Sequence, residues 1–186
     1  MAASKRRSGP GPLFTKRLAL RAPTSGDLPS LEKMIRDRRV TAYFPRVARR
    51  WKRMGAIARN RRAFREGKAY GYVIVERHTS TFIGTVSIMR IDREERTAEL
   101  GYMITRPNWG KGYATEAARR LCKFALYPLK LRRLDANVTE GNAGSVAVLR
   151  KIGFRAEGSS RKAVLVRGRW RDLLKFGLLA KELQTD

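Results

Sequence analysis

The sequence predicts a mixed α+β fold in one domain, with a central, mostly antiparallel sheet and helices on its faces. Stretches with apolar residues at helical spacing alternate along the chain with short runs rich in β-branched and aromatic residues. Three such runs follow one another in mid-chain, which is typical of antiparallel hairpins, whereas a later one stands alone between two helices. The 186 residues, of which 42% are hydrophobic, suit one domain with its own core.

The N-terminal part is expected to contain a strand and two helices. Residues 17–23 alternate as a short strand, and turn formers then precede apolar residues at helical spacing within 24–40. A second helix is expected within 44–67, closed by Gly67. Its apolar face would consist of Val47, Trp51, Met54, Ala58 and Phe64.

The remaining elements are predicted from the same periodicities. The expected strands are 69–76, 80–91, 93–105, 132–139 and two within 162–179 about a turn at Gly168; the expected helices are 113–127, stopped by Pro128, and one from Asn142 or Ser145 to Gly153. Trp170 and Asp172 alternate on the last strand. We expect Trp170 in the core and Asp172 beside an arginine.

The net charge of +26 is large and unevenly distributed. Residues 1–68 carry 20 Lys and Arg against 4 Asp and Glu, and residues 69–186 carry 22 against 12. Such a field favours polyanionic surroundings. The segment 46–65, with nine Lys or Arg and no acid, is the candidate contact to RNA or the ribosome.

The N-terminus is basic and free of acids. We predict a flexible basic arm over 1–15 and one catalytic domain over 16–183. A transit peptide has the same composition, so the cytoplasm is the favoured location and an organelle matrix the alternative. No apolar run approaches the roughly 18 residues of a membrane span, so no membrane partner is expected.

The sequence contains few residues that could bind a metal ion or form a disulfide. Cys122 is the only cysteine and falls in an apolar helical pattern, which predicts a buried structural thiol. His78 is the only histidine and stands in a polar turn. We therefore expect no metal site.

The stretch NWGKGYATEA, residues 108–117, is a candidate phosphate-binding loop. It fails the P-loop pattern because Gly112 follows Lys111, and it departs from the Rossmann fingerprint because Thr115 replaces the third glycine. Gly110 and Gly112 allow close backbone approach, and the free N–H groups of a helix beginning near Tyr113 would face one anion. Lys111 adds positive field, and Ala114 keeps the first turn small enough for a pyrophosphate.

The sequence resembles the GNAT superfamily of acyl-CoA-dependent N-acetyltransferases, and within it the RimJ/RimL-type ribosomal-protein alanine N-acetyltransferases. The resemblance rests on RLALR, FIGTVSI, AELGYMITRPNWGKGYATEAARRL, NAGSVAVLRKIGFRAEG and VRGRWRDLL, in the family's order over about residues 16–180. Trp109 stands where the general GNAT loop has Gln or Arg, a change usual in the RimJ-like branch.

The resemblance implies acetyl-CoA as cosubstrate and a GNAT fold in which one strand splays from its neighbour. That strand would be 100–104, with 134–138 as its partner. The implied CoA-binding residues are Met103, Ile104, Trp109, Gly110, Lys111, Gly112, Tyr113, Ala114, Thr115, Asn137 and Asn142.

Two residues are candidates for catalysis. By resemblance, Ser145 would lie near the thiol and hydrogen-bond the departing thiolate. Glu99 would act as the base that deprotonates the amine, since strand alternation places it on one face with Gly101 and Met103. Glu157 is a second candidate base.

The expected function is transfer of acetyl to the N-terminal α-amine of a protein, and a ribosomal protein is the expected acceptor. Two alternatives remain open. One is acetylation of a small-molecule amine, such as an antibiotic or polyamine. The other is a ribosome- or RNA-associated GNAT-fold component with reduced or no turnover.

Overall fold

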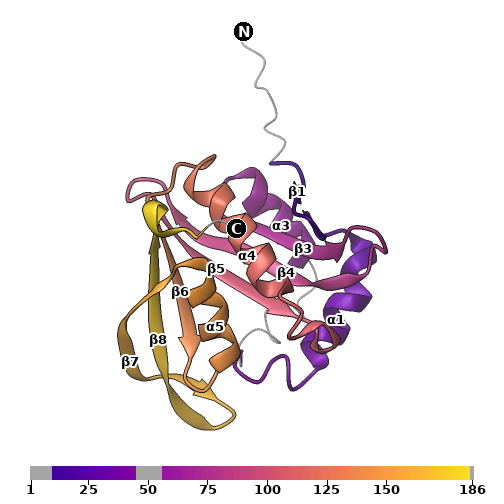
Figure 1. Cartoon of the computed structure of the whole chain (residues 1–186). Coiled ribbons are helices and arrows are strands. Elements are labelled where there is room, and N and C mark those ends of the chain that lie inside the picture. The colour runs from indigo at the N-terminus through magenta and orange to yellow at the C-terminus, as the bar shows by residue number, and fades with distance from the viewer. Residues whose placement is uncertain (1–9, 45–55, 185–186) are drawn as a thin grey trace.

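The computed structural model describes residues 10–44 and 56–184, and Figure 1 shows them as one sheet flanked by helices. The sheet has eight strands in the order β1-β2-β3-β4-β5-β6-β8-β7. Every pair of neighbours is antiparallel except β5 and β6, which run parallel. The predicted mixed, mostly antiparallel sheet is confirmed.

The elements have the following bounds. The strands are β1 (Leu13–Phe14), β2 (Leu18–Arg21), β3 (Tyr70–Glu76), β4 (Phe82–Asp92), β5 (Thr97–Ile104), β6 (Arg133–Thr139), β7 (Arg155–Val166) and β8 (Arg169–Leu179). The helices are α1 (Leu28–Arg36), α3 (Ala56–Arg65), α4 (Tyr113–Leu126) and α5 (Ala143–Ile152). Short 3₁₀ turns occupy Ser25–Asp27, Arg106–Asn108 and Ala180–Glu182.

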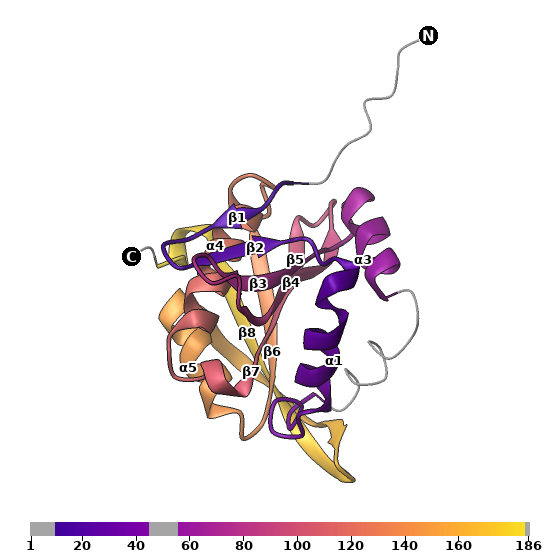
Figure 2. The same cartoon turned by 90° about the vertical axis from the view of Figure 1, so that its right-hand side faces the viewer.

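Helices cover both faces of the sheet. In Figure 2, α1 and α3 lie on one side and α4 and α5 on the other. The larger core forms between α4 and the sheet, where Leu121 and Cys122 are fully buried. A smaller cluster, which includes Leu31, Met34 and Met103, packs under α1. Burial raises the pKa of the Cys122 thiol, so the prediction of a buried, unreactive cysteine is confirmed.

Three strands differ from the predicted bounds. The last two strands were predicted within 162–179, but β7 begins at Arg155, because residues 155–160 pair with the second half of β8. Leu13 and Phe14, which the sequence assigned to the basic arm, pair with β2 because Leu13 is buried in the core. The third strand of the mid-chain run begins at Thr97 rather than at 93, because residues 93–96 form a turn in which Asp92 accepts a hydrogen bond from the Glu95 amide at 2.8 Å.

Three side-chain predictions were wrong. Trp170 is 61% exposed, beside Leu165, which is also exposed, because the end of the β7–β8 hairpin extends beyond the helices. Asp172 accepts from the backbone amide of Lys162 at 2.9 Å instead of pairing with an arginine. Ala58 of α3 is exposed, contrary to its predicted place on the apolar face. Phe64 of the same predicted face is buried and packs edge-on against two tyrosine rings. Val47, Trp51 and Met54 lie outside the described residues.

Within residues 10–44 and 56–184, no helix combines the length and apolar character that a membrane crossing would need.

Candidate active site

The central feature of the site is an opening between two strands. The parallel pairing of β5 with β6 covers three residue pairs and ends at Glu99 and Asp135. Beyond that point β5 continues to Ile104 beside β4 alone, and β6 continues to Thr139 beside β8 alone. The predicted splayed strand pair is confirmed, with its vertex at Glu99.

Backbone groups of β5 line this opening. The Thr105 amide donates to the Ile83 carbonyl on the β4 side at 2.9 Å. Because backbone direction alternates along an antiparallel strand, the amides of Ile104 and Tyr102 face away from β4, toward the opening. The indole N–H of Trp109 donates to the Ile104 carbonyl at 2.8 Å. Trp109 therefore anchors the end of β5, and the Ile104 amide remains directed at the opening.

The glycine loop lies at the mouth of this opening. Gly110 and Gly112 have φ of +73° and +79°, in the left-handed region that favours glycine. Gly112 is the N-cap of α4, and the first bond of the helix runs from the Glu116 amide to the Gly112 carbonyl at 3.1 Å. The amides of Tyr113, Ala114 and Thr115 precede that bond, so they are available to an anion.

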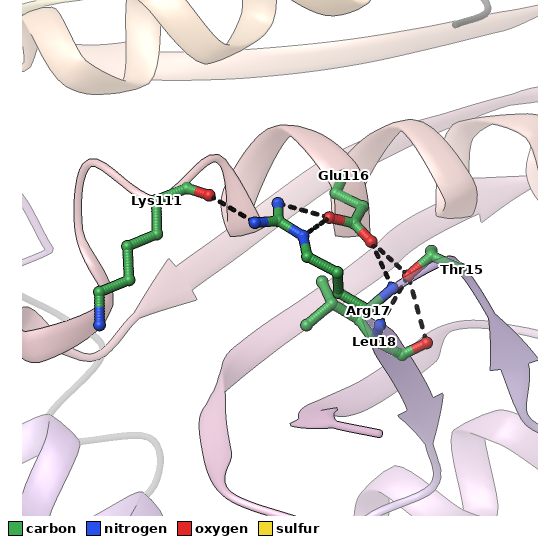
Figure 3. Close-up of polar contacts among 5 residues, drawn as sticks. All are labelled: Thr15, Arg17, Leu18, Lys111 and Glu116. Atoms are coloured by element: carbon green, nitrogen blue, oxygen red, sulfur yellow. Dashed lines mark hydrogen bonds and ion pairs between the residues drawn. The ribbon is translucent and has the colours of Figure 1, made fainter. Parts of the chain in front are cut away.

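A residue of the N-terminal part holds the loop in place (Figure 3). Arg17 donates to the carbonyl of Lys111 at 3.1 Å and forms an ion pair of 2.6 Å with Glu116 in the first turn of α4. Its guanidinium also lies 4.6 Å from the ring centre of Tyr113. Arg17 thus ties both sides of Gly112 to the start of β2. This contact could not be predicted from the sequence, because the partners are separated by more than ninety residues.

Glu116 is kept ionised by the same cluster. Burial alone would raise the pKa of this carboxyl, but it accepts bonds from the Thr15 hydroxyl, at 2.7 Å, and from the backbone and side chain of Arg17. These bonds outweigh burial and hold the pKa of Glu116 below its usual value. The ion pair that supports the loop therefore persists at neutral pH.

A pair of hydroxyls lies on the α5 side of β5. Asn142 caps α5 and accepts from the Ser145 amide at 3.2 Å, which confirms Asn142 as the N-cap. The hydroxyl of Ser145 lies 2.8 Å from that of Tyr102. Burial raises the pKa of Tyr102 to about 12, only partly opposed by this hydrogen bond, so the phenol stays protonated at neutral pH. Tyr102 was not among the site residues predicted from the sequence, although strand alternation indicated that its side chain faces away from Glu99.

The candidate bases differ in their surroundings. Glu99 lies at the vertex, with its side chain 19% exposed and ion-paired to Arg90 of β4. It lines a cavity of about 410 Å³ together with Asn137 of β6. Glu157 is bound by Arg133, and these hydrogen bonds lower the pKa of its carboxyl. Glu99, in contrast to Glu157, lies on β5 at the point where the β5–β6 pairing ends.

The sequence also singled out a histidine, which is not part of this site, and a basic segment. His78 is an exposed turn residue, and the described part of the chain contains no group of His, Cys, Asp or Glu side chains that could hold a metal ion. The basic segment 46–65 is described only from residue 56 onward.

A split sheet with a glycine loop at its mouth is the architecture of an acyl-CoA-binding domain, and comparisons with known proteins agree. The profile of the acetyltransferase (GNAT) domain family matches residues 17–155. The chain belongs to this GNAT family.

The chain is also similar to several individual proteins with different names. "Uncharacterized N-acetyltransferase p20" of Bacillus licheniformis is 37% identical over 63% of this chain and 66% of its own length. Spermidine N(1)-acetyltransferase of Escherichia coli is 29% identical over 50% of each chain. In p20 and two further Bacillus relatives, the chain spans 58–66% of the relative's length. The solved structure of Mycobacterium smegmatis RimJ in complex with CoA-disulfide is 26% identical, with a TM-score of 0.80 over 95% of this chain and 89% of that one.

The site residues of this chain fit CoA. The amides at the start of α4 and the exposed Lys111 suit a pyrophosphate, and the open edge of β5 offers backbone groups to an amide-bearing arm. Asn142 and Ser145 lie at the start of α5.

We predict that Arg17→Ala weakens CoA binding about 10-fold, or about 1.4 kcal/mol. The variant removes the bond to the Lys111 carbonyl and leaves Glu116 without its cation. Isothermal titration with CoA measures the effect. Arg36→Ala is the matched control, because its exposed ion pair with Glu32 lies on α1. An unchanged affinity in folded Arg17→Ala protein would show that the loop keeps its shape without β2.

Proposed function

We propose that this protein transfers the acetyl group of acetyl-CoA to an amine, and that its acceptor is the N-terminal α-amine of a polypeptide, with ribosomal proteins as the first candidates. The observation that carries the proposal is the opening between β5 and β6, which has the glycine loop at its mouth and Glu99 at its vertex. When bound, acetyl-CoA supplies the acetyl group as a thioester.

Binding is assigned to backbone groups more than to side chains. The amides of Tyr113, Ala114 and Thr115, with Lys111, are proposed to hold the pyrophosphate. The backbone of Met103 and Ile104, together with Asn137 and Asn142, would orient the rest of the cosubstrate. Trp109 acts by fixing the end of β5 through its bond to the Ile104 carbonyl.

Ser145 and Tyr102 form the proposed hydrogen-bond donor to the leaving thiolate. The Tyr102 hydroxyl reaches both the Ser145 carbonyl, at 3.1 Å, and Ser145 Oγ, at 2.8 Å. When Tyr102 donates to Ser145 Oγ, the Ser145 hydroxyl can donate outward to a sulfur anion. The buried phenol stays protonated and therefore supports Ser145 as a donor. Ser145 and Tyr102 would in this way stabilise the leaving group.

Glu99 is the proposed base. The attacking amine must be neutral, and an α-amino group has a reference pKa of about 8, so the base has a modest task at neutral pH. The Glu99 carboxylate lies at the vertex of the opening, on the α1 side of the sheet. It could remove the proton directly or through a water molecule.

A small-molecule amine is the second candidate acceptor. The cavity at Glu99 is lined by four carboxylates, of Asp92, Glu99, Asp135 and Glu157, and by three cations, of Arg90, Arg133 and Lys175. This cavity is therefore slightly acidic within a strongly basic protein, which would suit a polyamine. The named spermidine relative supports this alternative, whereas the similarity to RimJ supports the polypeptide.

The discriminating experiment measures thiol release from acetyl-CoA. Peptides with the N-terminal sequences of ribosomal proteins are compared with the same peptides blocked at the N-terminus, with spermidine and with an aminoglycoside. Turnover restricted to unblocked peptides is expected. Turnover restricted to a small amine would replace the polypeptide by the second candidate. CoA binding with no turnover, together with salt-sensitive RNA binding, would instead identify a ribosome- or RNA-associated protein.

We predict that Ser145→Ala lowers kcat about 10–100-fold and leaves the KM for acetyl-CoA within about 2-fold. The change removes the donor hydroxyl, while the amide bond to Asn142 is retained. Tyr102→Phe should cost about 3–10-fold in kcat, because Ser145 keeps its own proton. Steady-state kinetics with the best acceptor measure both. Ser25→Ala, in the exposed turn before α1, is the control. An equal rise in KM and fall in kcat/KM would assign Ser145 to binding alone.

We predict that Glu99→Gln lowers kcat about 10–100-fold at pH 7, and that the deficit shrinks toward pH 9. More of the amine is then neutral without help, given its pKa of about 8. The pH profile of kcat is the measurement. Arg90→Gln, which removes only the partner of Glu99, should stay within about 3-fold of wild type. A deficit that is constant with pH would mean that Glu99 does not act as a base.

A further inference from the structure

A second cavity lies beyond the opening, and arginines dominate it. It has a volume of about 350 Å³ and is bounded by the loop after α1, the β6–α5 loop and the β7–β8 hairpin. Figures 1 and 2 both show the end of this hairpin beside the loop that follows α1. The hairpin contributes Arg167, Arg169 and Arg171, and Glu140 is the only acid among the described residues of the lining.

The cavity adjoins the proposed reaction centre. Gly141 lines it, Asn142 caps α5, and Ser145 bonds to Tyr102. Ser145 lies four positions after Gly141, a path of at most about 14 Å even if fully extended. A polypeptide whose first amine lies at the opening would therefore reach this cavity within about its first five residues.

Among the residues that the structure describes, no acidic side chain forms an ion pair with the arginines of the cavity. Arg167 donates to the carbonyl of Arg38, a neutral group. Arg169 and Arg171 have no acidic partner within residues 10–44 and 56–184, and Asp172 is engaged by the Lys162 amide. The cavity therefore keeps an excess of cations that an anionic ligand would offset.

The walls are held together before any ligand arrives. The Tyr43 hydroxyl donates to the Gly141 carbonyl at 2.9 Å, and the buried Thr139 hydroxyl donates to the Tyr43 carbonyl at 3.1 Å. These two bonds join the loop after α1 to the end of β6. A wall that is already ordered loses little entropy on binding.

We propose that this cavity binds carboxylate side chains near the N-terminus of the acceptor, so that the protein selects polypeptides that begin with an acidic segment. Guanidinium groups pair with carboxylates in bidentate geometry. The cavity is small and walled in part by Tyr43 and Val166, which suits one or two side chains better than a nucleic-acid backbone. The inference rests on the proposed function for the position of the amine.

The test uses two acceptor peptides that are identical except at positions 2–5, where one carries Asp and Glu and the other Asn and Gln. Wild-type protein is expected to favour the acidic peptide at least about 10-fold in kcat/KM. Combined Arg169→Gln and Arg171→Gln should bring this ratio near 1 and leave the amide peptide within about 2-fold. Arg161→Gln, an exposed position of β7 outside the cavity, should keep the preference.

Peptide affinity for the CoA-saturated protein, measured by titration calorimetry, separates this inference from the proposed function. A preference in binding without any turnover would retain the cavity's role and reject the polypeptide acetyltransferase. Equal kcat/KM and equal affinity for the two peptides would overturn the inference. An unaltered peptide ratio in the double variant, with weakened binding of an RNA oligonucleotide, would also overturn it and make the cavity an RNA contact.

Discussion

The short pairing between β5 and β6 is the constraint on which the candidate site depends. Buried backbone N–H and C=O groups need partners, so a sheet that opens in its middle, after Glu99 and Asp135, creates a demand for hydrogen bonds. An extended ligand with its own amides can meet that demand. The opening also sets the direction in which such a ligand would lie, since the glycine loop lies at its mouth and the Ser145–Tyr102 pair lies beside it. The proposed base Glu99 and the proposed Ser145–Tyr102 pair would then approach the reacting bond from opposite faces of the sheet.

The opening is stabilised by contacts between distant parts of the chain. Arg17, at the start of β2, holds the loop that precedes α4 through Lys111 and Glu116. On the other side, Tyr43 and Thr139 join the loop after α1 to the end of β6. The N-terminal part therefore does more than complete the sheet, because it fixes both approaches to the space between β5 and β6.

The net charge of +26 does not indicate how charge is distributed between the two cavities. The cavity at the vertex is slightly acidic, whereas the cavity beside Gly141 is strongly basic. A polypeptide acceptor with carboxylate side chains near its N-terminus would place its amine at the acidic cavity and its carboxylates at the basic cavity. The net charge of the whole chain and the charge within each cavity are thus separate features of the same protein.

The sequence by itself determined the sheet class, the helix spacing and the glycine loop, because these follow from local periodicity and from conformations that glycine favours. It also identified Asn142 as a cap and Cys122 as a buried thiol. It could not show that Trp170 is exposed, that Glu99 is paired with Arg90, or that Tyr102 meets Ser145. Those outcomes depend on which strands become neighbours and where their pairing stops. Only the tertiary structure decides that, because contacts between residues far apart in the chain leave no periodic signal in either segment.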